Sequence, residues 1–560
     1  MPLQARWNLA IPNIGLPDLL FTSPSRPQSK TERLFIDAAR PDTHYFTIHE
    51  FALWCKRFAA GLQKAGLQQG DRVFFFSPND LFFPVVIIGT IMAGGIFTGA
   101  NPSYTPREVA YQVQDCSAKF VISAEAGLDT VIAGVESLGM SRDKVYLFSG
   151  DVFDGKGQGK SGCRYWGDLI ASREEGELFS WESGSSEEFL NRTISLNYSS
   201  GTTGVPKGVE ITHRNWVSNI LQFNFLATLR SDYEEREKHT KWLLFLPMYH
   251  AMAQNFVCAS LLRKVPMYIM NKFDFPKMLE NIEKFRISDL KMVPPIAVMV
   301  AKSPLVKNYD LSSIRSLGSG AAPLGIEVSQ ELETLFQKNE LYVRQGWGMT
   351  EVTCSLLGWD PSLKGSNASV GELNPNCEAK IMDEEGIREL GRNQRGELWV
   401  KGPNVMKGYW GKPKETQETM TEDGWLKSGD IAYVDETGKF YIVDRKKELI
   451  KVKGNQVAPA ELEGVLLDHP AVADAAVIGV TLDGDECPRA YITLKEGKVA
   501  TATDIIEYMK KNVAPTKRIT GGVIFTDSIP KNPSGKILRK ILRERAAKEL
   551  QNEGKSSAKL

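Results

Sequence analysis

Short apolar runs alternate with stretches of helical periodicity between residues 30 and 440. Arg72–Ser77 and Lys119–Ser123 are compact apolar runs and predict buried strands. Phe275–Phe285 repeats apolar residues at helical spacing and predicts an amphipathic helix. Because strands that alternate with helices pack into sheets covered by helices, the pattern predicts an α/β fold for this part of the chain.

The longest apolar stretch, Leu81–Phe97, contains no charged residue. Its length is at the short limit for a membrane-spanning helix, and Pro84 and three glycines interrupt it. A buried helix that follows the strand Arg72–Ser77 explains the stretch better. The sequence therefore predicts no transmembrane segment.

The pattern changes near residue 428. Ser428–Val443 predicts two short strands around a turn at Glu436–Gly438. The charged run Asp444–Glu448 suits an exposed connector, so we place a domain boundary near Lys447. Further elements are predicted as helices at Ala458–Asp468, Ala502–Asn512 and Ile537–Leu550 and as strands at Ala471–Val480 and Arg489–Leu494. The predicted units are an N-terminal domain (1–446), a small α+β domain (447–553) and a flexible tail (554–560).

Length, charge and cysteine usage narrow the class of protein. A chain of 560 residues is too long for one hydrophobic core. Its 68 basic residues are offset by 68 acidic residues, which leaves no positive excess for binding nucleic acid. The seven cysteines are scattered without a Cys-x-x-Cys pair, so neither a disulfide framework nor a zinc site is indicated. A reducing compartment fits this usage.

Residues 197–208, Asn-Tyr-Ser-Ser-Gly-Thr-Thr-Gly-Val-Pro-Lys-Gly, carry the clearest chemical signal. Glycines let the backbone approach an anion, and the N–H groups, hydroxyls and Lys207 can all donate to phosphate. The next stretch, Val209–Ile220, is predicted to begin a helix whose N-terminus faces the same anion. The alternative is a solvated Gly/Ser/Thr linker, and the Walker A spacing is absent.

Five further positions allow both a functional and a structural interpretation. Trp347, between two glycines, could stack on adenine or fill the core at a strand end. Glu351 is a hard oxygen ligand suited to Mg²⁺ beside phosphates. His250 follows an apolar run, where histidine is often structural, and Asp430 fits a ribose contact or a Gly-Asp turn. Lys536 follows a Pro/Gly-rich turn and reaches a catalytic site only if its whole domain delivers it there.

Several motifs in the same order resemble the adenylate-forming superfamily, which comprises acyl-CoA synthetases, luciferases and nonribosomal adenylation domains. The motifs are the loop 197–208, Val293–Ile296, Lys302–Pro304, Tyr309–Ile314, Ser319–Gly325, Val443–Arg445 and Lys453–Glu463. They are most similar to those of 4-coumarate–CoA ligase-like acyl-CoA ligases, over roughly residues 30–545. The resemblance implies a large domain of layered αβαβα architecture and a small mobile C-terminal lid.

The resemblance also implies a two-step reaction on a small-molecule carboxylic acid. The carboxylate attacks ATP to give acyl-AMP and pyrophosphate, and coenzyme A then displaces AMP to give a thioester. ATP, Mg²⁺ and coenzyme A are the implied co-substrates and cofactor. Mg²⁺ and lysine would stabilise charge that develops on the phosphates, and the site would exclude water from acyl-AMP.

Matching positions imply roles for individual residues. The residues that would bind ATP or AMP are Ser199, Ser200, Gly201, Thr202, Thr203, Lys207, Ala322, Gly346, Trp347, Thr350, Asp430, Arg445, Lys447, Lys451, Gln456 and Lys536. Catalytic roles fall to His250, Thr350, Glu351, Lys451, Gln456 and Lys536, with Glu351 also the metal ligand. Lys272, Lys453 and Gly454 would contact coenzyme A, and Lys447 would be the hinge of the lid. The acyl pocket would comprise His250, Met252, Gly318, Gly320, Gly346, Val352 and Cys354.

Two departures from the plant ligases bear on the substrate. Met252 stands where those enzymes have a tyrosine, and Gly318 stands where they have a methionine. The pocket is therefore expected to be apolar and deep, with no evident cation for a second carboxylate. Aryl-alkanoic or cinnamic acids and medium-to-long-chain fatty acids both fit. The alternative function is a stand-alone adenylation enzyme that loads a carrier protein.

The last three residues, Ala558-Lys559-Leu560, resemble a C-terminal peroxisomal address. They predict recognition by the peroxisomal import receptor and a place in the peroxisomal matrix. A cytoplasmic location is the alternative.

Overall fold

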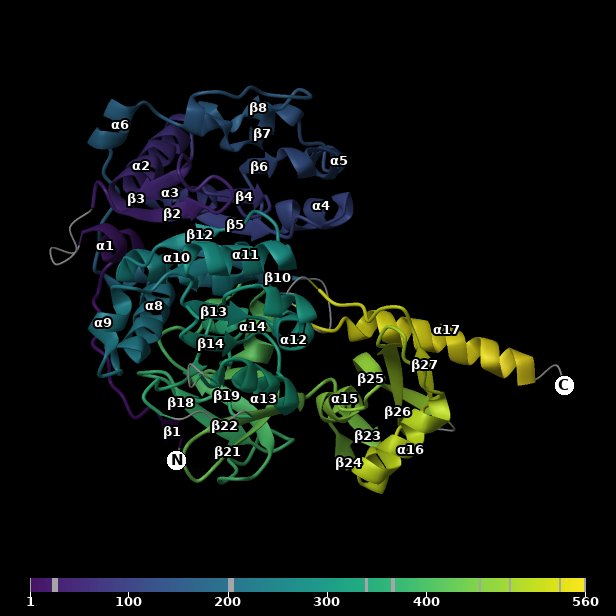
Figure 1. Cartoon of the computed structure of the whole chain (residues 1–560). Coiled ribbons are helices and arrows are strands. Elements are labelled where there is room, and N and C mark those ends of the chain that lie inside the picture. The colour runs from purple at the N-terminus through teal and green to yellow at the C-terminus, as the bar shows by residue number, and fades with distance from the viewer. Residues whose placement is uncertain are drawn as a thin grey trace.

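The computed structural model describes residues 2–22, 29–199, 206–337, 341–363, 368–452, 455–482, 485–532 and 535–557 (Figure 1). At Asn455, Gln456, Asp485 and residues 551–557 it describes the backbone alone. Two large sheets, one smaller sheet and the helices around them form the N-terminal part of the chain, up to about residue 445. The last hundred residues form a separate small unit, which lies beside α12 and α13 in Figure 1.

The first large sheet has eight strands in the order β20-β10-β9-β5-β4-β6-β7-β8. Their bounds are β4 Arg72–Phe76, β5 Ile96–Ala100, β6 Phe120–Ala124, β7 Val145–Phe148, β8 Arg164–Tyr165, β9 Thr193–Ser199, β10 Lys207–Thr212 and β20 Gly408–Tyr409. The two strands predicted at Arg72–Ser77 and Lys119–Ser123 are confirmed as β4 and β6. The apolar stretch after β4 folds as the buried helix α3 (Phe83–Met92), and none of the described helices is long and apolar enough to span a membrane.

The second large sheet has seven strands in the order β15-β14-β13-β11-β12-β2-β3, all parallel except β3. Their bounds are β2 Arg33–Asp37, β3 Tyr45–Thr47, β11 Trp242–Leu244, β12 Met267–Ile269, β13 Asp289–Met292, β14 Ser316–Ser319 and β15 Val343–Gln345. Lys291, Gly318 and Arg344 are register partners across β13, β14 and β15. Side chains at these three positions therefore share one face of the sheet.

The third sheet is antiparallel and runs β1-β18-β19-β21-β22. Its strands are β1 Leu3–Gln4, β18 Glu378–Met382, β19 Gly396–Lys401, β21 Leu426–Val434 and β22 Phe440–Arg445. The turn predicted at Glu436–Gly438 joins β21 to β22, and Gly438 has a φ of 82°, which glycine adopts without strain. This hairpin makes Asp430 and Arg445 cross-strand partners.

The helices cover the faces of the sheets, and the predicted α/β fold class is confirmed. Those of the N-terminal part are α1 Leu16–Phe21, α2 Ile48–Lys64, α3 Phe83–Met92, α4 Pro106–Asp115, α5 Leu128–Ser137, α6 Arg173–Leu178, α7 Glu187–Leu190, α8 His213–Thr228, α9 Tyr233–Glu237, α10 Ala251–Arg263, α11 Phe275–Phe285, α12 Pro294–Lys302, α13 Ile326–Leu335 and α14 Pro413–Thr419. The largest apolar cluster joins both large sheets to α3 and α10, as Phe75, Leu244 and Phe256 illustrate.

One local prediction is wrong. The residues after the glycine-rich loop do not begin a helix at Val209; they form β10, which pairs antiparallel with β9. Val209 and Ile211 are fully buried and alternate with polar residues, a period that favours a strand. The helix, α8, begins only after Thr212, whose side chain caps it together with Asn215. The loop therefore connects two strands, and no helix N-terminus follows it directly.

The small C-terminal unit has its own core. It contains the strands β23 Ile450–Val452, β24 Asn455–Val457, β25 Val472–Leu482, β26 Asp485–Leu494 and β27 Val523–Phe525 and the helices α15 Pro459–Leu467, α16 Ala502–Asn512 and α17 Arg539–Ser557. The main apolar cluster ends at Phe440, and the clusters of the small unit begin at Ile450. This division supports a boundary near Lys447, which we retain as a proposal.

Candidate active site

A cavity of about 460 Å³ extends along β13, β14 and β15 and beyond their carboxyl ends. Its wall includes residues from far apart in the sequence, among them Ser199 at the end of β9, His250 at the start of α10 and Lys536 from the small domain. The 3₁₀ turn Thr350–Val352 follows β15 and contributes Thr350 and Glu351. The cavity thus joins three sequence regions that were singled out for separate reasons.

Asp430, Arg445 and Trp347 form one hydrogen-bonded group beside the cavity. Arg445 Nε lies 2.7 Å from Asp430 Oδ1, and Trp347 Nε1 donates to Asp430 Oδ2 at 2.8 Å. Burial raises the pKa of Asp430, while Arg445 and the indole N–H act in the opposite direction. Trp347 is only 7% exposed, so the bond to Asp430 fixes its ring beside the carboxylate.

A short hairpin of the small domain carries Lys536 to this group. Lys531 and Ile537 pair across the hairpin, and Asn532 and Lys536 exchange two hydrogen bonds. Gly535 has a φ of 81° and packs so tightly on Pro295 that a Cβ atom there would lie 2.4 Å from the proline ring. The sequence predicted that Lys536 reaches a catalytic site only if its whole domain brings it there. In the structure Lys536 lines the cavity together with Arg445.

The pKa of Lys536 gives a pH prediction. Burial and the charge of Arg445 lower this pKa from its usual value to about 8. If the protonated amine neutralises charge on the phosphates, kcat/KM for adenylation should fall about tenfold per pH unit above pH 8. Lys536→Arg should move this loss to higher pH, because a guanidinium stays protonated. Identical pH profiles of pyrophosphate release for the two proteins would contradict the assignment.

Glu351 and Lys207 are linked through one aromatic ring. Tyr409 Oη donates to Glu351 Oε1 at 2.9 Å, and Lys207 Nζ lies 4.5 Å from the centre of the Tyr409 ring. Glu351 is 6% exposed and contributes to the wall of the cavity next to Thr350. Lys207, at the end of the predicted phosphate loop, and the predicted metal ligand Glu351 therefore contact the same tyrosine.

His250 is another residue of the cavity wall. It precedes α10, and burial lowers its pKa to about 4, so the imidazole is neutral near pH 7. Its Nε2 is buried and has no hydrogen-bond partner among the described residues, and the same holds for Oγ of Ser319, which also lines the cavity. Unpaired buried polar atoms are costly, so their concentration here favours a ligand-binding region.

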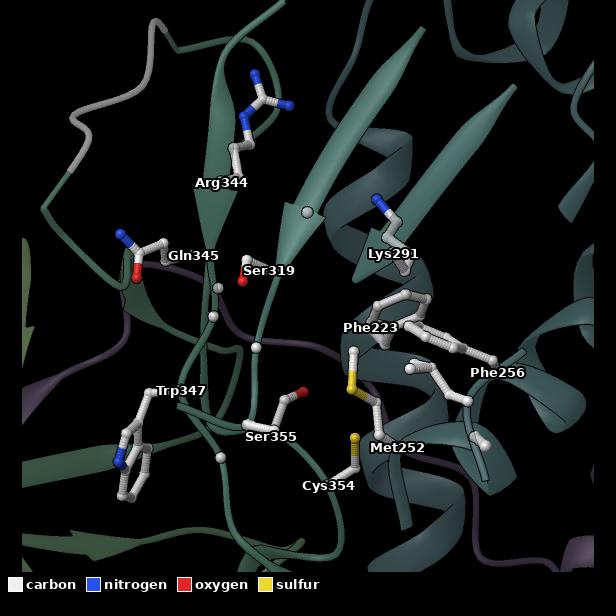
Figure 2. Close-up of a pocket in the computed structure, with 18 of the residues that line it drawn as sticks. Phe223, Met252, Phe256, Lys291, Ser319, Arg344, Gln345, Trp347, Cys354 and Ser355 are labelled. Atoms are coloured by element: carbon white, nitrogen blue, oxygen red, sulfur yellow. The ribbon is translucent and has the colours of Figure 1, made fainter. Parts of the chain in front are cut away.

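The middle of the cavity is apolar. Met252, Phe223, Phe256 and Cys354 face it, as Figure 2 shows. A Cβ atom on Gly320 would lie 3.6 Å from Met252 Cε, so a larger side chain at this position would occupy space next to Met252. Several lining residues were not predicted, among them Leu226, Ala227, Trp242, Leu246 and Val293.

The far end of the cavity is cationic, and the expectation of a pocket without a cation is wrong. Its lining includes Arg230, Arg236, Arg263, Lys291, Arg315 and Arg344, together with Glu237 and Asp289. None of these residues belongs to a recognisable motif. They come from α9, α10 and the strands β13–β15, or from segments next to them, and only the fold brings them together.

Comparison with known proteins agrees with this geometry. The sequence model described as AMP-binding enzyme matches residues 25–410. The chain belongs to the AMP-binding enzyme family. The model of the family's C-terminal domain matches residues 461–536, which lie in the small unit.

Named relatives of this AMP-binding enzyme are plant ligases. It is 37% identical over 513 residues to 4-coumarate–CoA ligase 1 of Petroselinum crispum, covering 90% of this chain and 89% of the relative. It is 38% identical over 517 residues to 4-coumarate–CoA ligase 1 of Solanum tuberosum, covering 90% of each. Among solved structures, ATP-bound MatB from Rhodopseudomonas palustris superposes with a TM-score of 0.80 at 26% identity, over 95% of this chain and 98% of that one. The predicted superfamily and the predicted enzyme class, AMP-forming acid–CoA ligase, are confirmed.

Some predicted site residues of the AMP-binding enzyme do not reach the cavity. Lys451 and Lys272 are exposed; Lys451 Nζ lies 3.3 Å from Glu384 Oε1. Val352 is fully buried in the core and is not a lining residue, which corrects its place in the acyl pocket. Ala322 lies next to the lining residue Ala321 without lining the cavity itself.

Other predicted residues fall elsewhere or outside the description. Lys447 is exposed in the turn between β22 and β23, as a hinge residue would be. Ser200, Gly201, Thr202, Thr203, Lys453 and Gly454 lie outside the described residues, as does the side chain of Gln456. Predicted residues that do line the cavity are Ser199, His250, Met252, Gly318, Gly320, Gly346, Trp347, Thr350, Glu351, Cys354, Arg445 and Lys536.

Proposed function

We propose that the enzyme joins an acid with an apolar body to coenzyme A in two steps, through an acyl-AMP intermediate formed from ATP. One observation carries the proposal: Lys536 of the small domain lines the same cavity as Arg445, Thr350 and Glu351, and the middle of that cavity is apolar. A polar end for a nucleotide and an apolar continuation suit an enzyme that attaches AMP to an organic acid. Aryl-alkanoic, cinnamic and medium-to-long-chain fatty acids are candidate substrates.

The polar end can serve the adenylation step directly. Asp430 can accept hydrogen bonds from the ribose hydroxyls while Arg445 holds its carboxylate in place. The ammonium group of Lys536 and the hydroxyl of Thr350 can donate to phosphate oxygens as negative charge develops on them. His250 also lines the cavity, and its unpaired Nε2 could contact the reacting carboxylate.

The residues present fit a magnesium ion at this end. Glu351 supplies a buried carboxylate, and within the described part of the chain no three His, Cys, Asp or Glu side chains gather as a metal site. Mg²⁺ is commonly bound by one or two carboxylates and by substrate phosphates, so a single Glu351 is sufficient. When bound, the ion would neutralise charge on the phosphates.

The second step requires a different face of the small domain. Lys536 lies at the cavity, whereas Lys451 on β23 pairs with Glu384 and Lys447 lies in the exposed turn before that strand. We propose that the small domain rotates about Lys447 and then presents the segment around Lys453 to coenzyme A. Its separate hydrophobic core supports movement as one body.

A substrate panel tests the function. Purified enzyme, ATP and Mg²⁺ are combined with mono- and dicarboxylic acids, with and without coenzyme A, and pyrophosphate and acyl-CoA are measured. We expect pyrophosphate release and acyl-CoA formation for at least one acid. Pyrophosphate release without free acyl-CoA would favour loading of a carrier protein, and no pyrophosphate with any acid would rule the proposal out.

The cellular location stays a prediction. Ala558-Lys559-Leu560 lies outside the described residues, immediately after α17. Peroxisomal import through this tripeptide, and the cytoplasmic alternative, can be tested by deleting it from a fluorescent fusion that leaves the C-terminus free.

A further inference from the structure

Lys291 and Arg344 flank a gap that a glycine leaves open. Both are register partners of Gly318, on the strands to either side of β14. Neighbouring strands are about 4.8 Å apart, so the two side chains arise roughly 10 Å apart on the same face of the sheet. Figure 2 shows them on separate strands at the end of the cavity away from Trp347.

Gly318 itself is required by this arrangement. A Cβ atom there would lie 3.0 Å from Lys291 Cδ and 3.5 Å from its Nζ. Any larger side chain would therefore displace Lys291 or fill the space between the two cations. The departure noted in the sequence at Gly318 thus makes room for the lysine and does not simply enlarge an apolar pocket.

The cations at this end outnumber the carboxylates that could neutralise them. Glu237 already forms a bidentate ion pair with Arg263, whose Nε and Nη2 lie 2.6 and 2.7 Å from the two carboxylate oxygens. Asp289 Oδ1 forms a long ion pair with Lys291 Nζ at 4.0 Å, and the same Nζ donates to Ser316 Oγ at 3.0 Å. Neither these two carboxylates nor any other described one forms an ion pair with Arg344.

Two more arginines add to the positive charge. Arg236 and Arg315 each donate to the other's backbone carbonyl, at 2.8 and 3.3 Å. Across the described ranges, neither makes an ion pair with a carboxylate. The cluster is therefore positive overall, and like charges at short range are unfavourable unless an anion joins them.

Arg344 uses one nitrogen of its guanidinium group to hold a loop and keeps another donor unpaired. Its Nη2 holds the next loop by donating to the carbonyls of Pro361 and Leu363 at 2.8 and 3.2 Å. Its Nε is buried and has no partner among the residues described. Burial and the charges of Arg230 and Arg236 lower the pKa of Arg344 to about 10, with Asp360 opposing. Anchoring the loop explains the two backbone contacts but not the unpaired donor or the neighbouring Lys291.

We propose that the acid ligated by this enzyme carries a second carboxylate at the end remote from the reacting one, and that Lys291 and Arg344 bind it above Gly318. The apolar walls at Phe223, Phe256 and Met252 would hold the hydrocarbon body between the two ends. The proposal rests on the proposed function, since it specifies the acid that the same cavity accepts. A bidentate arginine and a lysine are suited to recognising a carboxylate.

The test compares acids that differ only at the far end. Decanedioic acid is paired with decanoic acid, and 4-carboxycinnamic acid with cinnamic acid, and kcat/KM is measured by pyrophosphate release. In at least one pair we expect the dicarboxylic acid to be preferred by about 10- to 100-fold, because a site built for a polar group discriminates strongly against its absence. A preference for the monocarboxylic acid in both pairs would overturn the proposal while leaving the proposed function intact.

Variants then locate the preference. Lys291→Met should lower the ratio of the two kcat/KM values towards one, mainly by raising KM for the dicarboxylic acid. Arg344→Gln is a second variant should the first not fold, and Lys277→Met is the control, because Lys277 is exposed on α11 and pairs with Glu280. A ratio that neither cavity variant changes would also overturn the proposal. No pyrophosphate from any acid would instead reject the proposed function, and this inference with it.

Discussion

Lys536→Ala is expected to slow acyl-adenylate formation about 100- to 1,000-fold, because it removes a preorganised cation from the phosphates. Lys536 lines the cavity from the small domain, together with Asn532, and is close enough to Arg445 for burial and that charge together to lower its pKa. Thioester formation from supplied acyl-AMP should change by no more than about threefold, because charge on the leaving pyrophosphate is not involved in that step. ATP–pyrophosphate exchange measures the first step, and coenzyme A-dependent consumption of acyl-AMP measures the second.

The control for this variant is a lysine of the same domain outside the cavity. Lys510 lies on α16 and pairs with Glu507 on the surface. Lys510→Ala should leave both half-reactions at the wild-type rate. Equal loss of both half-reactions in Lys536→Ala would contradict the division of work between two faces of the small domain.

Gly535→Ala is expected to reduce adenylation about 100-fold with little effect on thioester formation. The new Cβ atom would lie 2.4 Å from Pro295 of α12, and the positive φ of 81° adds strain of its own. The hairpin would have to move by about 1 Å, and displacements of that size are enough to cost two orders of magnitude when they misplace a catalytic group. The same two half-reaction assays apply.

Gly522→Ala is the control that distinguishes backbone strain from the steric clash with Pro295. Gly522 lies in the same domain with a φ of 96°, yet a Cβ atom there would have no neighbour within 4 Å. It should therefore cost some stability while keeping the ratio of the two half-reactions unchanged. If both glycine variants lost adenylation equally, the contact between Gly535 and Pro295 would not be what positions Lys536.

The sequence predicted the elements with strong periodicity and the residues that belong to motifs. The helix at Phe275–Phe285 and the strand after Arg72 depend on local patterns, and the structure has them at the predicted places. The helix expected at Val209 failed because Val209–Thr212 pair with β9, and a strand partner outweighs the local preference. The prediction that Val352 lines the acyl pocket failed because a residue next to a catalytic motif can still have its side chain buried in the core.

The cationic end of the cavity could not be predicted for a different reason. Lys291, Gly318 and Arg344 are separated by 27 and 26 residues and share no local motif. They become neighbours only through the register of parallel strands, and that register is set by the packing of the whole sheet. The glycine was visible in the sequence, but its function was not, because the residue that needs the space lies on another strand.

The separate cores on either side of Lys447 have a consequence for heating experiments. No apolar cluster of the described residues spans the connection, so the two parts are held together by polar and surface contacts. The chain need not unfold in one cooperative step, and a calorimetric trace should contain two transitions whose enthalpies scale with the sizes of the two parts. A single melting temperature would then describe only the larger part, and a substitution that weakens the lid could pass unnoticed in such a measurement.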